Sequence, residues 1–338
     1  MPDASSSLKF GTSGLRGLVV DLVGGPARDW TAAFLAHMEA AGTTERLLLI
    51  GRDLRPSSPE IAGDCAAAAR AAGWAVADCG ALPTPALALA ALERRAAAVM
   101  VTGSHIPDDR NGLKFYAPGE ITKADEEAIR AAHEAGAPPQ SAGGTESQDI
   151  GAAAQAAYLD RYAAAFGAEA LSGLTVGVYQ QSSVARDLLV AVLERLGAQT
   201  VALGRADRFI PVDTEAHRPE DVELLRDWAE AGRYAAIVST DGDADRPLVA
   251  DAAGHILRGD VLGLLVAQVL GLDTIVTPVT SSAAMETSGV ARRVIRTKVG
   301  SPFVIAGMEE AGAAGVLGFE ANGGCLLGSD AAAPAGTL

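Results

Sequence analysis

The chain has 338 residues, and at roughly 100–200 residues per domain this length predicts two or three domains. Hydrophobic residues make up 49% of the chain and aromatic residues 4%, so the cores are expected to consist mainly of Ala, Val, Leu and Ile. The 27 basic and 42 acidic residues give a formal net charge of −15, which argues against binding to nucleic acid or to an anionic membrane surface. No apolar run reaches the length of a membrane span, no secretory signal begins the chain, and the three cysteines lack disulfide or redox spacing. The sequence therefore predicts a soluble, cytoplasmic protein.

Short apolar strands alternate with Ala- and Leu-rich helices along the chain, which predicts an α/β fold. The expected strands are continuous apolar runs, typical of strands that are buried on both faces of a helix-covered sheet. They comprise Leu47–Asp53, Ala97–Ser104, Leu174–Tyr179, Thr200–Leu203, Ala235–Thr240 and Thr274–Val279. One helix is expected to begin at Ser57 and stop at Gly73, and further helices are expected over Arg186–Leu196, Glu220–Ala231, Asp260–Leu270 and Pro302–Ala311.

Two breaks divide this pattern. The segment 137–147 is rich in Pro, Gly and Ser and is typical of a linker, and a weaker break falls at the turn Asp251–His255. We therefore predict three units, 1–150, 151–252 and 253–338, with the same strand–helix order. The tail 331–338 predicts no regular element, so the third unit is expected to be incomplete.

The segment Phe10–Gly17 contains three glycines and one arginine. Its spacing fits neither a dinucleotide-binding fingerprint nor a P-loop. We interpret it as a flexible loop whose backbone N–H groups and arginine suit an anion.

The segment Thr102–Phe115 follows an expected strand, which delivers Ser104 to a loop at the carboxyl end of a sheet. Ligand sites of α/β proteins gather at such edges. Ser104 can therefore be a nucleophile, a phosphate carrier or simply a turn former. His105 is expected to be a poor general base for it, because neighbouring side chains of an extended chain point in opposite directions.

Three carboxylates at alternate positions follow the expected strand Ala235–Thr240: Asp241, Asp243 and Asp245. Such spacing lets a tight loop surround one hard cation with oxygen ligands. An EF-hand is excluded by Arg246, which stands at the position of the loop glycine. An acidic surface turn is the alternative, but three like charges this close repel one another unless a cation neutralises them. Mg²⁺ is favoured, because three side chains leave coordination positions open for a phosphate oxygen or water.

The segment Gly318–Gly324 places Glu320 and Asn322 on a glycine-rich loop. These two side chains could hydrogen-bond neighbouring hydroxyls of a sugar, and an ordinary turn is equally compatible. The five histidines are scattered without metal-ligand spacing.

Taken in order, Phe10–Gly17, Thr102–Lys114, Asp241–Arg246 and Gly318–Gly323 resemble the α-D-phosphohexomutase superfamily, and within it the phosphomannomutase/phosphoglucomutase group. The resemblance implies three successive, similar α/β domains with mixed sheets. It assigns the phosphoserine to unit 1–150, the metal site to unit 151–252 and sugar recognition to unit 253–338. It also implies a fourth domain, which these 338 residues do not include.

The implied enzyme is a mutase that interconverts the 1- and 6-phosphates of mannose or glucose through a bisphosphorylated sugar, with a hexose phosphate as its partner. Ser104 would carry the phosphoryl group and contact a Mg²⁺ held by Asp241, Asp243 and Asp245. The other residues that the resemblance implies are Arg16, Lys114 and His105 for catalysis, and Arg246, Lys298, Gly300, Glu320 and Asn322 for substrate binding.

The chain departs from the family pattern in four places. Ile106 stands where the family usually has asparagine, Asn322 where it has serine, and Gly324 and Ser301 where it has histidine. These departures concern the identity of the sugar more than the reaction. Phosphoglucosamine mutase is the nearest alternative, although Thr102-Gly103-Ser104 favours the hexose group. A non-catalytic sugar-phosphate-binding protein is the alternative from a different class.

Overall fold

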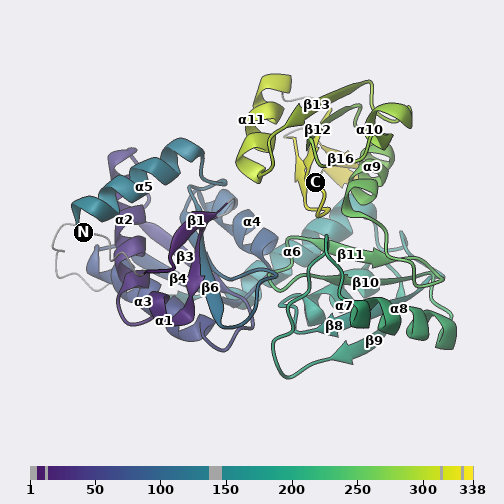
Figure 1. Cartoon of the computed structure of the whole chain (residues 1–338), viewed down its shortest axis with the longest axis horizontal. Helices are drawn as coiled ribbons and strands as arrows, with labels where there is room; N and C mark the ends of the chain where they lie inside the picture. Colours follow the sequence, from purple (N-terminus) through teal and green to yellow (C-terminus); the bar gives the residue numbers. More distant parts are fainter. Residues whose placement is uncertain (1–5, 12–13, 137–146, 313–314, 329–330, 338) are drawn as a thin grey trace. The chain divides into compact units, whose positions relative to one another are not determined.

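The computed structural model describes residues 6–11, 14–136, 147–312, 315–328 and 331–337. The chain divides into two compact units (Figure 1). The first comprises Met1–Ala156 and Phe209–Pro211, and the second comprises Ala157–Arg208 and Val212–Leu338. In the part that the structure describes, no helix is both long enough and apolar enough to cross a membrane.

The first unit contains a seven-stranded mixed sheet in the order β1-β2-β6-β5-β3-β4-β7. Its central strand β3 pairs in parallel with β4 and β5, whereas β6 runs antiparallel to β5 and β2. The strands are β1 (Lys9–Gly11), β2 (Gly14–Leu18), β3 (Leu47–Arg52), β4 (Ala75–Ala81), β5 (Ala97–Val101), β6 (Arg110–Tyr116) and β7 (Ser147–Asp149).

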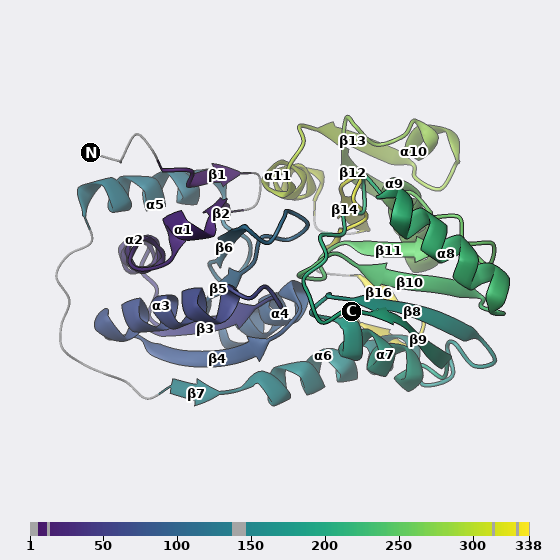
Figure 2. The same ribbon diagram turned by 60° about the horizontal axis from the view of Figure 1, so that its bottom comes forward.

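Helices cover this sheet because its central strands are apolar on both faces. One face packs its buried side chains, among them Leu48 and Val99, against Phe34 of α2, Ile61 of α3 and Ile129 of α5. Figure 2 shows α2 and α5 side by side, above β3 and β4. Helix α4 packs against β3 and β5. The helices are α1 (Val19–Leu22), α2 (Pro26–Ala40), α3 (Ser58–Ala71), α4 (Thr84–Arg94), α5 (Lys123–Ala135) and α6 (Gly151–Phe166), the last of which continues into the second unit.

The second unit contains two four-stranded sheets, β11-β10-β8-β9 and β13-β12-β14-β15. Their strands are β8 (Thr175–Gln181), β9 (Gln199–Arg205), β10 (Ala236–Thr240), β11 (Pro247–Ala250), β12 (Thr274–Pro278), β13 (Arg293–Thr297), β14 (Val316–Phe319) and β15 (Cys325–Leu327). The helices are α7 (Arg186–Arg195), α8 (Pro219–Ala231), α9 (Gly259–Leu270), α10 (Ala284–Thr287) and α11 (Ser301–Ala311).

One four-stranded pattern occurs three times. In each copy the first strand pairs in parallel with the second and, on its other side, with the third, and the fourth runs antiparallel to the third. The copies are β3–β6, β8–β11 and β12–β15. Three similar α/β domains with mixed sheets are therefore confirmed, and the loop between the third and fourth strands holds Ser104, Asp241–Arg246 and Glu320–Gly324 respectively.

Four expectations are corrected. The segment 10–17 is not a flexible loop where it is described, because it contributes to the antiparallel strands β1 and β2. The strand expected over Ala97–Ser104 ends at Val101, and a further strand that was not predicted, β6, begins at Arg110. The predicted strand Thr200–Leu203 is not buried on both faces, because β9 lies at a sheet edge and Val201 is exposed. The tail forms two short paired strands, β16 (Ala332–Ala333) and β17 (Gly336–Thr337). The expected linker lies outside the described residues from 137 to 146.

Candidate functional site

Ser104 lies directly beyond β5, at the carboxyl end of the first unit's parallel strands, and its side chain is buried. Its backbone is left-handed, with φ at 54°, a conformation that costs a non-glycine residue about 1–2 kcal/mol. The Ser104 N–H donates to Thr102 Oγ1 over 2.8 Å. Because Ser104 is not extended, the expectation that His105 points away from it is wrong: His105 Nδ1 lies 3.2 Å from Ser104 Oγ.

A buried ion pair that the sequence analysis did not identify lies beneath this loop. The Arg55 side chain and the Asp53 side chain are both fully buried, and Arg55 Nε lies 3.1 Å from Asp53 Oδ2. Asp53 also accepts hydrogen bonds from the hydroxyls of Ser58, at 2.6 Å, and Thr102, at 2.7 Å. The position of Asp53 directly after β3, at the same sheet edge as Ser104, was the available signal.

Arg16 and Lys114 lie on adjacent antiparallel strands, β2 and β6. Leu15 pairs with Leu113 in the core, so alternation along the strands places Arg16 and Lys114 together on the opposite face. Gly112 lies between them, and a Cβ at this position would meet Arg16 Cγ at 2.9 Å and the Leu15 carbonyl at 2.3 Å. A glycine is therefore needed for the Arg16 side chain to cross β6. Lys114 thus lies on the strand that follows the Ser104 loop, and Arg16 lies on the strand next to it.

The three predicted metal ligands converge in the second unit. One carboxylate oxygen from each of Asp241, Asp243 and Asp245 lies within 4.8 Å of the others. Ala244 has a left-handed backbone, with φ at 62°, and forms the tight turn. The loop is closed by the Asp241 N–H, which donates to the Arg246 carbonyl over 3.1 Å. Oxygens this close together fit one small, hard cation.

The last residue of β8 and the loop after it support this turn, and they were not identified from the sequence. Gln181 Nε2 donates to the Thr240 carbonyl over 2.7 Å, and Ser183 Oγ lies 2.6 Å from Thr240 Oγ1. The Val184 N–H donates to the Gly242 carbonyl over 3.0 Å. These buried polar groups fix the entrance and the middle of the carboxylate loop.

Arg246 is the cation of this loop, and its Nε lies 3.9 Å from Asp245 Oδ1. Burial acts to lower the pKa of Arg246, but attraction to Asp245, Asp241, Asp243 and Glu215 outweighs burial, so the pKa is raised overall. One guanidinium is therefore attracted by four carboxylates.

Glu320 begins the equivalent loop beyond β14. Its Oε1 accepts a hydrogen bond of 2.9 Å from the N–H of Gly300, which caps helix α11. Burial raises the pKa of Glu320, although Arg246 and the Gly300 N–H oppose this effect. The structure thus brings Glu320 together with Gly300 and within the electrostatic reach of Arg246.

Asn322 is buried, and its Oδ1 accepts from the Gly324 N–H over 2.9 Å. Its backbone carbonyl accepts from Thr214 Oγ1 over 3.0 Å, a contact that links residues 108 positions apart. Thr214 was not identified from the sequence. These bonds indicate that the Asn322 side chain shapes the loop.

The carboxylate loop and the Glu320–Gly324 loop are in direct contact. A Cβ at Gly324 would lie 2.9 Å from the Asp245 carbonyl oxygen, and one at Gly323 would lie 3.2 Å from Pro247 Cγ. Gly324, where the family usually has histidine, therefore lets the two loops meet. A metal bound by the carboxylates would be close to groups that can hydrogen-bond a sugar.

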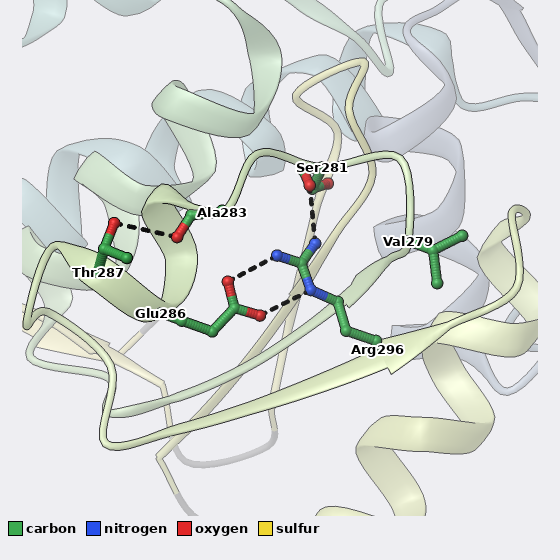
Figure 3. Close-up of a pocket in the computed structure, with 6 residues that line it drawn as sticks. All are labelled: Val279, Ser281, Ala283, Glu286, Thr287 and Arg296. Carbon is green, nitrogen blue, oxygen red and sulfur yellow. Dashed lines mark hydrogen bonds and ion pairs between the residues drawn. The ribbon is translucent and has the colours of Figure 1, made fainter.

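Lys298 is exposed, and its ammonium lies 5.5 Å from the ring centre of Phe303. Close to it along the chain, Arg296 lies in an open pocket of about 480 Å³ (Figure 3). Arg296 makes two bonds of 2.8 Å to Glu286 and also donates to the carbonyls of Pro278, Ser281 and Ser282. Arg296 thus anchors the turn after β12, and its charge is balanced. The pocket is lined by Val279, Ser281, Ala283, Glu286, Thr287 and Arg296, none of which is a predicted site residue.

Comparisons with known proteins agree with this arrangement. Family models for the α/β/α domains I, II and III of phosphoglucomutase/phosphomannomutase match residues 7–139, 156–254 and 258–337. The chain is 50% identical over 332 residues to a phosphomannomutase of Sinorhizobium fredii, covering 95% of this chain and 70% of that protein. It is 31% identical over 343 residues to a phosphoglucosamine mutase of Symbiobacterium thermophilum, and the match covers 95% of this chain and 74% of that protein.

A crystal structure of a phosphoglucomutase/phosphomannomutase family protein from Burkholderia thailandensis is similar, with a TM-score of 0.76 at 25% sequence identity. The match covers 94% of this chain and 71% of that one. The fold and the three loops define a hexose-phosphate mutase architecture of repeated α/β/α domains. The chain belongs to the phosphoglucomutase/phosphomannomutase family.

Proposed function

We propose that this chain is an isomerase that moves a phosphoryl group between the 1- and 6-positions of a hexose, with Ser104 as the phosphoryl carrier. The observation that supports this most is the contact between the carboxylate loop and the Glu320–Gly324 loop, through Gly324 and the Asp245 carbonyl. It supports the proposal because the proposed cation site and the proposed hydroxyl-binding groups then lie side by side, and phosphoryl transfer to a sugar requires both. We further propose that units 1–150, 151–252 and 253–338 carry the phosphoserine, the metal and the sugar contacts.

The proposed transfer balances without a nucleotide. The bond between phosphorus and Ser104 Oγ breaks as one forms to a hexose hydroxyl oxygen; the hydroxyl proton leaves to a base, and Ser104 Oγ gains a proton. In the second transfer the other phosphate of the bisphosphorylated sugar moves to Ser104 Oγ, which loses its proton, and the sugar oxygen that the phosphate leaves gains one. We assign Lys114 and Arg16 to proton transfer and to stabilisation of charge on the phosphoryl oxygens. In its Nδ1-unprotonated tautomer, His105 can accept the Ser104 proton, since Nδ1 lies 3.2 Å from Oγ.

Mg²⁺ is the proposed metal. Octahedral ligands at about 2.0–2.1 Å lie about 3 Å or 4 Å apart, so oxygens within 4.8 Å of one another fit this ion after small adjustments. When bound, Mg²⁺ neutralises negative charge on the transferring phosphoryl group. Asp241, Asp243 and Asp245 would hold it, and Arg246 keeps the loop closed.

The proposed substrates are mannose and glucose phosphates. The chain is more similar to the phosphomannomutase than to the phosphoglucosamine mutase, and Thr102-Gly103-Ser104 agrees with the hexose group. Glu320, Asn322, Lys298 and Gly300 are the proposed substrate-binding residues. A cytoplasmic location follows from this proposal, because hexose phosphates are cytoplasmic metabolites.

A coupled assay tests the proposal. It would use mannose, glucose and glucosamine 1-phosphates, each with Mg²⁺ and a trace of the matching bisphosphate. We expect turnover of a hexose phosphate with a higher kcat/KM than that of the amino sugar. A preference for the amino sugar would establish the phosphoglucosamine alternative, and binding without turnover would establish the non-catalytic one.

The carrier is tested separately by incubation with a hexose 1,6-bisphosphate. Intact-mass and peptide analysis should then show one phosphoryl group on Ser104. Ser104→Ala should lose both the label and turnover, whereas Ser172→Ala, at an exposed turn of the second unit, should keep both. A label on another serine would overturn the assignment.

A further inference from the structure

Arg55 is an unusual arginine because its side chain is fully buried, beside the equally buried carboxylate of Asp53. It follows β3 and precedes α3, at the sheet edge where the Ser104 loop begins. A charge at this depth persists only when it is paired and hydrogen-bonded. The contacts of Arg55 therefore reveal its role.

All five N–H donors of the guanidinium are engaged. Nε donates to Asp53, and the other four donate to backbone carbonyls of one loop. The distances are 2.9 Å to Ser104, 2.6 Å to Ile106, 2.6 Å to Pro107 and 3.1 Å to Arg110. No N–H remains for a phosphate, so Arg55 is not an anion-binding residue. The planar guanidinium of Arg55 therefore holds four carbonyls of the Ser104 loop in one fixed arrangement.

Asp53 holds the other side of the Ser104 backbone. Thr102 Oγ1 donates to Asp53 Oδ2 over 2.7 Å and accepts from the Ser104 N–H over 2.8 Å. The N–H of Ser104 is therefore held through Thr102, and its carbonyl is held by Arg55. These two restraints offset the cost of the left-handed conformation at Ser104.

Two further contacts fix the guanidinium itself. The Phe209 ring lies under it, with the guanidinium carbon 4.0 Å from the ring centre. On the loop side, a Cβ at Gly103 would lie 2.7 Å from Arg55 Cζ and 2.8 Å from Nη2. Gly103 is thus the residue that lets the loop backbone approach the guanidinium closely.

We infer that Arg55, oriented by Asp53, is a positioning residue that presents Ser104 Oγ for phosphoryl transfer by holding the Ser104 backbone in its left-handed conformation. This inference rests on the proposed function, since it assigns a task to the phosphoryl-carrying serine. Lysine cannot replace Arg55, because an ammonium has three donors and no planar fork. A misplacement of about 1 Å at a reacting atom can reduce the rate by about a hundredfold.

The test compares Arg55→Lys with Arg110→Lys. Arg110 is the first residue of β6, where the Ser104 loop ends, and its side chain is exposed, so its substitution leaves the carbonyl that Arg55 binds in place. We expect Arg55→Lys to lower kcat and the single-turnover rate of Ser104 phosphorylation about a hundredfold. The KM for hexose phosphate should stay near the wild-type value, and Arg110→Lys should behave as the wild type in every respect.

Gly103→Ala keeps every donor but displaces the guanidinium, so it provides a second route to the same result if Arg55→Lys does not fold. Amide hydrogen exchange at Ser104 and Ile106 should accelerate in both variants. Unchanged kcat and phosphorylation rate per folded molecule, in whichever variant folds, would overturn the inference and leave Arg55 with a stabilising role only. Absence of phosphorylation and turnover in the wild type would instead refute the proposed function. Hydrogen exchange would still show whether Arg55 restrains the backbone of the Ser104 loop.

Discussion

The Ser104 loop and the carboxylate loop occupy the same place in two copies of one strand pattern, yet opposite charge arrangements hold them. Each follows the third strand of its copy and contains one non-glycine residue with a left-handed backbone, Ser104 or Ala244. The Ser104 loop is closed around a cation that the chain supplies, the Arg55 guanidinium. The carboxylate loop gathers three acidic groups, and Arg246 lies beside them.

Under the proposed function, this difference lets one backbone plan serve two chemical tasks. A loop that presents a nucleophile must be rigid before the substrate arrives, and an internal ion pair provides that rigidity at all times. A loop that binds a metal keeps its negative charge for the ion, so its stability depends on that ion. Neutralising Asp53, beneath the Ser104 loop, should therefore destabilise the protein whether or not Mg²⁺ is present, whereas neutralising one aspartate of the carboxylate loop should weaken the response of stability to Mg²⁺.

The largest effect is expected for Asp53→Asn. Removal of this carboxylate leaves the Arg55 guanidinium buried without its counter-charge, and breaking a buried pair costs about 3–5 kcal/mol. Urea unfolding should show this loss in the first unit equally with and without Mg²⁺. A variant as stable as the wild type would contradict the role assigned to the pair.

Asp243→Asn should instead increase the stability of the second unit when no metal is bound. Without metal, the variant should be more stable than the wild type, because one of three repelling charges has gone. With Mg²⁺, the wild type should gain stability and the variant much less, and turnover should fall by about two to three orders of magnitude. Asp251→Asn, at an exposed acidic turn, is the matched control. The same Mg²⁺ dependence in Asp243→Asn and the wild type would count against a metal loop.

Glu320→Gln, in the loop of the third copy, should weaken substrate binding but increase stability at neutral pH. Loss of one charge-assisted bond to a sugar hydroxyl, worth about 1.5–3 kcal/mol, should lower kcat/KM about 10- to 100-fold. Because burial raises the pKa of Glu320 in the folded state, its protonation favours folding, and this contribution is lost as the pH rises through the raised pKa. The variant should therefore be more stable than the wild type at neutral pH. The difference should vanish below the ordinary titration range of glutamate, as thermal melts over a pH series can measure.

The sequence predicted the central strands well, because continuous apolar runs such as Ala97–Val101 are typical of buried parallel strands. It did not predict the fourth strand of any copy, nor β4, β13 and β14. Strand β6 carries Asn111 and Lys114 among its apolar residues, and such polar residues obscure the pattern. Strand β9 was predicted to be buried on both faces, but it lies at a sheet edge, where apolar side chains such as Val201 are exposed.

The candidate site was predictable where side-chain type and spacing carry the chemistry, as in the three aspartates. It was not predictable where a side chain acts on distant backbone. Arg55 binds carbonyls about fifty positions along the chain, and Thr214 binds the carbonyl of Asn322, 108 positions away. Backbone carbonyls are the same at every residue, so no pattern of residue types identifies such contacts.

Thr214→Val gives the smallest expected effect and tests whether that distant contact matters. The substitution preserves side-chain volume but removes the hydroxyl that donates to the buried Asn322 carbonyl over 3.0 Å. An unsatisfied buried acceptor costs about 1–3 kcal/mol, so a modest fall in the stability of the second unit is expected. Since Asn322 shapes the loop that begins at Glu320, the KM for hexose phosphate should rise several-fold while the Mg²⁺ dependence stays unchanged. Thr200→Val, at the exposed edge strand β9, is the control. A change in the Mg²⁺ dependence would show that Thr214 acts on the carboxylate loop instead.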